Sequence, residues 1–91
     1  MRPHLDITKL DESQQAILDK TLEQFKRYGP IAMVSSHEIQ GLLDEEVHEL
    51  HHAVHSNDMS DIRAELIDVA VTALWGIMSI DQGKLDWPKE D

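Results

Sequence analysis

The stretch IRAELIDVAVTALWGIMSI, residues 62–80, is apolar on almost every side when it is placed on a helix. Its apolar residues include Ile62, Leu66, Ile67, Val69, Ala70, Val71, Ala73, Leu74, Trp75, Ile77 and Met78. One narrow strip of polar or small residues interrupts them, made of Asp61, Glu65, Asp68, Thr72, Gly76 and Ser79. A helix that is apolar on most sides is buried. The stretch therefore predicts a buried helix whose polar strip lines an internal site.

A first helix is predicted for residues 11–28, after a loose arm of residues 1–10. Its apolar side chains recur with helical spacing, at Leu18, Leu22 and Phe25. Asp11 followed by Gln14 resembles a capping box at the start of this helix. Gly29-Pro30 ends it, as a glycine just past a helix and a proline beyond usually do.

A second helix is predicted from the capping box of Ser35 and Glu38 to about His55. The third helix begins at a cap from Asp58 or Ser60 and ends near residue 81, and residues 84–91 are expected to be an irregular tail. No strand pattern is present. The chain is thus expected to be one all-α domain over residues 1–91, with an antiparallel helical hairpin and one packing helix.

Two pairs of acids stand three residues apart within these helices. Glu46 and Glu49 lie on one face of the second helix, and Glu65 and Asp68 lie on one face of the third. Glu46 falls inside the apolar stripe of its helix, seven residues after Ile39. Burying like charges without a partner is costly. Two such pairs that face each other predict a cation, and four carboxylates suit Mg²⁺ or Mn²⁺.

The motifs Glu-Glu-x-x-Glu at residues 45–49 and Glu-x-x-Asp at residues 65–68 resemble those of the MazG-like family of all-α nucleoside triphosphate pyrophosphohydrolases. The resemblance covers residues 25–80. It implies release of pyrophosphate from ribo- or deoxyribonucleoside triphosphates. It also implies Mg²⁺ ligation by both acid pairs: Glu46, Glu49, Glu65 and Asp68. A homodimer or a dimer of dimers, closing into a helical bundle, is expected.

Further site residues follow with less support from the motifs. Under the resemblance, the attacking water is oriented by Glu45 or Glu38, with Asp61 as a further option. Trp75 stacks on a base or belongs to the core, and Lys26 and Arg63 reach phosphates or are surface charges. The family's additional helix with lysine and asparagine contacts has no counterpart here. Lys84 or a neighbouring subunit would have to replace it.

The composition restricts the classes of partner. The formal net charge is −10, which argues against binding nucleic acid or an anionic membrane through bulk charge. It does not argue against a polyanionic substrate, because bound cations reverse the local sign. There is no cysteine, so disulfides, thiolate zinc sites and cysteine nucleophiles are excluded. No run is apolar enough to span a bilayer, and a cytoplasmic protein is expected.

Two alternatives stand beside the enzyme. His48, Glu49 and His52 match the H-E-x-x-H signature of zinc hydrolases, in which two histidines grip Zn²⁺. Both histidines are predicted to face solvent, away from Glu46, which counts against that site. The other alternative is a small acidic helical dimer that binds a partner protein, with solvated carboxylates and no dependence on metal.

Overall fold

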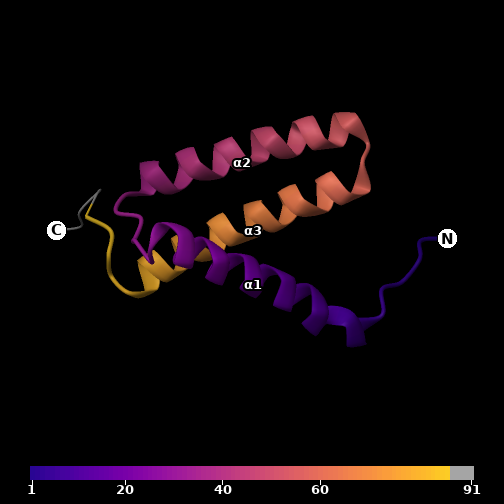
Figure 1. Cartoon of the computed structure of the whole chain (residues 1–91), viewed down its shortest axis with the longest axis horizontal. Helices are drawn as coiled ribbons and strands as arrows, with labels where there is room; N and C mark the ends of the chain where they lie inside the picture. Colours follow the sequence, from indigo (N-terminus) through magenta and orange to yellow (C-terminus); the bar gives the residue numbers. More distant parts are fainter. Residues whose placement is uncertain (87–91) are drawn as a thin grey trace.

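The protein is all-α, with three helices in the order α1, α2 and α3 (Figure 1). The computed structural model describes residues 1–86. A short 3₁₀ helix, η1 (Ile7–Lys9), leads into α1 (Leu10–Tyr28), which is followed by α2 (Ser36–Ser56) and α3 (Met59–Asp81). The predicted number and order of the helices are confirmed, and no strand occurs within the described residues.

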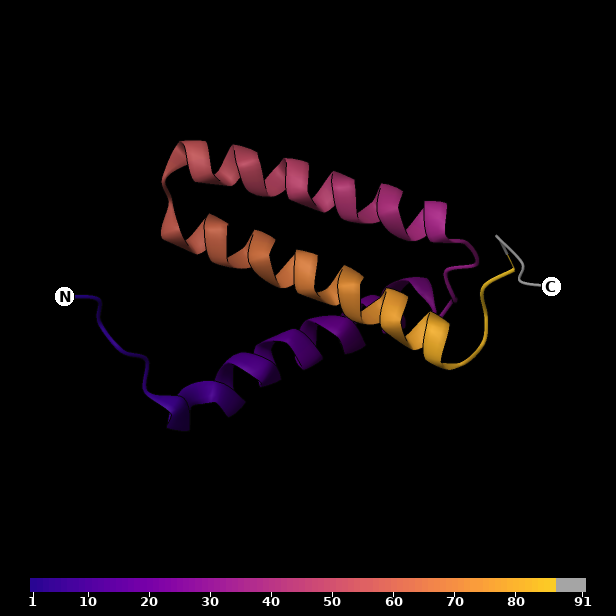
Figure 2. The ribbon, with the colours of Figure 1, turned by 180° about the vertical axis from the view of Figure 1, so that it is seen from behind.

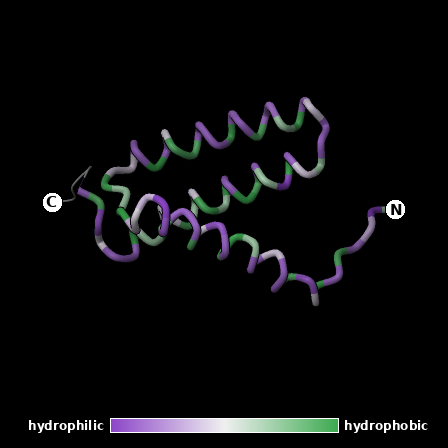
Figure 3. The backbone as a smooth tube through the Cα atoms, in the orientation of Figure 1, coloured by the Kyte–Doolittle hydropathy of each residue, from purple (hydrophilic) through white to green (hydrophobic). Residues whose placement is uncertain are grey.

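Helices α2 and α3 form the predicted antiparallel hairpin, and α1 crosses α3 on its other side (Figures 1 and 2). Over residues 1–86, α1 packs on α3 and makes no close backbone approach to α2. The hydrophobic parts of the α2 backbone lie mostly on the side toward α3 (Figure 3). Gly76 permits close packing there, because an added Cβ would lie 3.3 Å from Cγ2 of Ile39. This arrangement leaves a hollow between α1 and α2, with α3 beneath it.

Local hydrogen bonds fix the ends of the hairpin helices. The Ser35 hydroxyl accepts a hydrogen bond from the backbone N–H of Glu38 at 3.0 Å, as the capping box predicts. Asp58 caps α3 by accepting from the N–H groups of Ser60 and Asp61. Asn57 ends α2 in the left-handed conformation, with φ of 58°, which allows the chain to reverse within the short turn.

The start of the first helix differs from the expectation. Helical structure begins at Ile7 because the Asp6 carboxylate accepts hydrogen bonds from the N–H and hydroxyl of Thr8 and so caps η1. The predicted capping box at Asp11 is wrong. Lys9 is the N-cap of α1 and makes no side-chain capping bond, while Asp11 lies in the first turn, where its charge suits the helix dipole.

The segment that joins α1 to α2 is tied to α3. The buried Ser79 hydroxyl accepts from the N–H of Met33 at 3.0 Å and donates to the carbonyl of Trp75 at 2.9 Å. The indole N–H of Trp75 donates to the carbonyl of Ile31. Beyond α3, the N–H of Asp86 donates to the carbonyl of Val34. The irregular tail predicted for residues 84–91 lies outside the described residues from residue 87 onward.

The sequence predicts that α3 is buried on most sides, but within one chain it is not. Val71 is 4% exposed, but several large apolar side chains of α3 are more than half exposed. They are Leu66 at 52%, Ile77 at 54% and Ile80 at 58%. Helix α1 covers only one face of α3, and that geometry leaves the rest of the apolar surface open. Its burial by a second copy stays a prediction.

Replacing Ser79 by Ala is expected to lower the free energy of unfolding by about 1–3 kcal/mol, because the N–H of Met33 loses its buried partner. Chemical denaturation measures the effect. Ser60→Ala is the matched control, since the Ser60 side chain is exposed, and a change within about 0.5 kcal/mol is expected there. Equal effects of the two substitutions would contradict the role given to Ser79.

Candidate metal centre

Three acids from the two hairpin helices converge. Glu46 and Glu49 come from α2 and Glu65 comes from α3. One carboxylate oxygen of each lies within 4.8 Å of those of the other two. The spacing of three residues places Glu46 and Glu49 on one face of α2, and hairpin packing brings Glu65 opposite them. The structure thus brings together three of the four residues predicted as ligands.

Two of these carboxylates carry a buried oxygen atom with no hydrogen-bond partner. These atoms are Oε2 of Glu46 and Oε2 of Glu65. A buried polar atom normally has a partner, and leaving it without one costs about 1–3 kcal/mol. Paired oxygens of this kind fit a hard divalent cation, which prefers carboxylate ligands. The donor set contains no nitrogen or sulfur and therefore suits Mg²⁺ or Mn²⁺ better than Zn²⁺.

Burial and mutual repulsion perturb the titration of these acids. Burial, together with the negative charges of Glu49 and Asp68, raises the pKa of Glu46 from 4.5 to about 7. Burial and the charge of Asp68 also raise the pKa of Glu65 above its ordinary value. Without a cation, Glu46 is therefore partly protonated near neutral pH. A cation that displaces this proton binds more tightly as the pH rises.

Asp68, the fourth predicted ligand, lies at the edge of the cluster, near the ammonium group of Lys20. Burial raises its pKa, and the positive charge of Lys20 partly opposes that shift. The negative charge of Glu49 also raises the pKa of Asp68. Asp68 is therefore electrostatically coupled to the cluster, although its oxygens are not among the three that converge.

A cleft beside the cluster runs between α1 and α2, with α3 as its floor. One part of it, about 330 Å³, is lined by Gln24, Tyr28, Ile31, Ala32, Met33, Glu38, Leu42, Glu46, Thr72 and Trp75. A second part, about 300 Å³, shares five of these residues and adds Lys20, Asp68 and Val71. Because Glu46 lines both parts, the cleft reaches the acid cluster at Glu46.

The glutamates expected to orient water occupy different positions. Glu38 lines the cleft together with Glu46, and its Oε1 accepts a hydrogen bond from the N–H of Val34 at 2.8 Å. Glu45 is exposed next to Glu46. Asp61 is exposed in the first turn of α3, close enough to Glu65 for its charge to raise that pKa.

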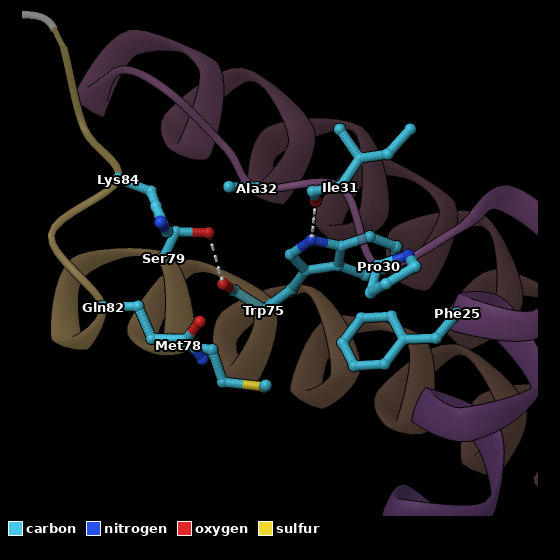
Figure 4. A pocket seen from close by; sticks show the side chains of 9 residues that line it. All are labelled: Phe25, Pro30, Ile31, Ala32, Trp75, Met78, Ser79, Gln82 and Lys84. Atoms are coloured by element: carbon cyan, nitrogen blue, oxygen red, sulfur yellow. Dashed lines mark hydrogen bonds between the residues drawn. The ribbon is translucent and has the colours of Figure 1, made fainter.

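The sequence left two roles open for Trp75, a core position and a place in the substrate site, and its contacts fit both. Its ring packs edge-on against Phe25, with centroids 4.6 Å apart and planes at 86°, and it also lines the cleft. Behind it lies a smaller hollow of about 150 Å³, bounded by Phe25, Pro30 and Met78 among others (Figure 4). The indole N–H is held by Ile31, so only the ring itself can contact a ligand.

The basic residues named from the sequence are not in the cleft. Lys26 is exposed and lines none of the described hollows, whereas Arg63 lines a neighbouring hollow of about 410 Å³ with Asp68. Sequence reasoning missed Lys20 and Gln24, which do line the cleft. The signal was available, since Lys20, Gln24 and Tyr28 recur every four residues and so share one face of α1.

The zinc-hydrolase motif divides between two faces of α2. His48 and His52 are exposed, with their Nε2 atoms 3.3 Å apart, whereas Glu49 belongs to the acid cluster. In residues 1–86, no third histidine, cysteine or acid side chain completes a set of metal ligands with the two histidines. The prediction that both histidines face solvent is confirmed.

No protein-family model, no curated protein and no solved structure matches this chain. Among the described helices, none combines the length and apolar character needed to cross a bilayer.

The perturbed acids predict how stability depends on pH in the absence of metal. Since the folded state holds a proton on Glu46 up to about pH 7 and the unfolded chain loses it near 4.5, folding binds protons between these values. The free energy of unfolding is therefore expected to fall, by about 1–3 kcal/mol, as the pH rises from 4.5 to 8 in EDTA. Urea denaturation at several pH values measures it.

Glu46→Gln is expected to flatten this pH dependence, because the amide does not ionise. Asp44→Asn, an exposed position on the same helix, is the control and should leave the slope as in the unmodified chain. If the free energy of unfolding of Glu46→Gln depends on pH as in the unmodified chain, the titrating group is not Glu46.

Proposed function

We propose that this protein is a metal-dependent nucleoside triphosphate pyrophosphohydrolase that releases a nucleoside monophosphate and pyrophosphate. The observation that carries the proposal is the pair of buried oxygens without partners, one on Glu46 of α2 and one on Glu65 of α3. They lie within a converging set of three carboxylates that borders a cleft. The sequence resemblance to MazG-like enzymes rests on the same residues.

In this proposal Glu46, Glu49 and Glu65 hold Mg²⁺ or Mn²⁺, and Asp68 joins them at the cleft edge. The bound cation supplies charge neutralisation for the phosphate oxygens during the displacement. Water attacks the α-phosphorus, the bond from that phosphorus to the bridging oxygen breaks, and pyrophosphate leaves. Of the two glutamates expected to orient the water, Glu38 lines the cleft near the connecting segment, where its carboxylate is held by the N–H of Val34. Glu45, which is exposed, is the weaker choice.

The cleft supports a nucleotide as the substrate. It combines carboxylates for cations at one end with the aromatic rings of Tyr28 and Trp75 at the other. A base offers a planar face for such rings, and the net charge of −10 requires cations to offset a polyphosphate. This combination is expected of a site for a metal-bound nucleotide.

The assembly into a dimer or a dimer of dimers belongs to the same proposal. An apolar groove between α1 and α3 is lined by Ile17, Leu18, Ala70, Ala73, Leu74 and Ile77, with Gln14 at its edge. Leu18 is 45% exposed and Ile77 is 54% exposed in one chain. The same groove is the observation that favours the second candidate function, a helical module that binds a partner protein without metal.

The class is tested by measuring pyrophosphate release from a panel of ribo- and deoxyribonucleoside triphosphates, with Mg²⁺ and with EDTA. Release that depends on Mg²⁺ is expected. Thermal stability is measured in parallel, since a cation that binds only the folded state raises it. The absence of both turnover and stabilisation by metal would favour the binding module.

Glu46→Ala and Asp68→Ala are each expected to lower the rate of pyrophosphate release more than about 100-fold, because metal affinity is lost. The metal-free variants should be as stable as the unmodified chain or more stable, since repulsion within the cluster is relieved. Asp44→Ala on the outer side of α2 is the control and should keep full activity. Full activity in Glu46→Ala would contradict the assignment.

A further inference from the structure

Three side chains of α1 line the cleft in a row. Lys20, Gln24 and Tyr28 are spaced by four residues, so they share a face and span about 12 Å along the helix axis. Lys20 lies at the end that faces Asp68, and Tyr28 lies at the end where α1 meets the connecting segment. The two ends of the cleft therefore differ in chemistry: one is charged, and the other is aromatic.

Lys20 is the single cationic side chain that lines the cleft in the part of the chain from residue 1 to 86. Its Nζ lies 3.6 Å from Oε1 of Glu23, one turn away on the same helix, and its side chain is 33% exposed. Local pairs of this kind contribute little, at most about 1 kcal/mol. The ammonium group is therefore available to a stronger partner.

The position of Lys20 joins two hollows. It lines the cleft with Glu46, and it also lines the neighbouring hollow of about 410 Å³ with Arg63. Asp19, Glu23 and Asp68 face this second hollow as well, so its walls bear no net positive charge. An anion is held there only when it arrives with its own cations, which a polyphosphate at a carboxylate metal site does.

The opposite end of the cleft suits a heteroaromatic ring. Tyr28 and Trp75 line this end with aromatic rings, Arg27 lies over the Tyr28 ring at 5.2 Å, and the Gln24 amide offers a donor and an acceptor. The Thr72 hydroxyl donates to the carbonyl of Asp68 at 3.0 Å and keeps its acceptor capacity. A nucleobase presents a flat face and an edge of donors and acceptors, and these groups match both.

We propose that Lys20 binds the departing pyrophosphate portion of the substrate, and that the nucleotide lies along α1 with its base at Gln24 and Tyr28. This inference rests on the proposed function. Lys20 exchanges its contact with Glu23 for phosphate oxygens, which accept stronger, charge-assisted hydrogen bonds. The orientation places the α-phosphorus between the two ends, next to Glu46 and the acid cluster.

The test is the affinity for inorganic pyrophosphate in the presence of Mg²⁺, measured by isothermal titration calorimetry without any turnover. Lys20→Met keeps the length of the side chain and removes its charge. It is expected to weaken pyrophosphate binding about tenfold or more. Lys9→Met is the matched control, because Lys9 forms the same kind of pair with Glu12, at 3.4 Å, far from the cleft. It should leave the affinity unchanged.

Tyr28→Leu tests the orientation from the other end. Loss of the ring is expected to weaken binding of a nucleoside monophosphate about fivefold and to leave pyrophosphate binding unchanged. Lys20→Met should show the reverse pattern. A substitution that weakens both ligands equally would contradict the orientation, as would equal pyrophosphate affinity in Lys20→Met and Lys9→Met.

This experiment and the turnover assay fail in different ways. Turnover of nucleotides with pyrophosphate affinity unaffected by Lys20→Met would overturn the inference and leave the proposed function standing. Pyrophosphate binding that depends on Lys20, without turnover of any nucleotide, would support a polyphosphate site and contradict the hydrolase. Absence of pyrophosphate binding in the unmodified chain would overturn the inference directly.

Discussion

The packing of α2 against α3 is the interaction on which the rest of this structure depends. It places Glu65 against Glu46 and Glu49 in a partly buried space, where like charges repel and solvent is restricted. Apolar contacts along the hairpin, with Gly76 against Ile39, hold the helices together despite that repulsion. Burying an ionised carboxylate without compensation is costly, and burial, together with the charges of the neighbouring acids, raises the pKa of Glu46.

The position of α1 turns this acid cluster into one wall of a cleft. Because α1 packs on α3 and not on α2, space remains between α1 and α2 directly above the acids. The connecting segment closes one end of that space. Ser79 and Trp75 hold it through hydrogen bonds to backbone groups of Met33 and Ile31, so the same two α3 residues stabilise the fold and shape the cleft.

Charge is distributed unevenly around the cleft. Acids dominate the side toward α2 and α3, and Lys20 lies opposite them on α1. Its positive charge opposes the upward shift in the pKa of Asp68. A polyphosphate with its cations would alter every one of these interactions at once. Under the proposed function, metal, substrate and Lys20 would act on the same electrostatic balance.

Much of the fold and part of the site were predictable from local patterns. The capping hydrogen bonds of Ser35 and Asp58 join residues no more than three apart, so the sequence predicts them. The helix starts that these two caps predict are confirmed. The start of the first helical segment was not predicted, because Asp6 caps the 3₁₀ helix η1 ahead of α1, and hydrophobic spacing does not reveal that short helix. The acids Glu46 and Glu65 stood out because each interrupts an apolar surface.

The sequence by itself determined three helices, their order and the faces that carry the two acid pairs, because helical periodicity fixes which side chains share a face. Only the tertiary structure decided which of those acids meet. Convergence of Glu46, Glu49 and Glu65, with Asp68 set against Lys20, depends on how α2 and α1 cross α3. Crossing geometry arises from packing between residues distant in the chain, and no local pattern encodes it.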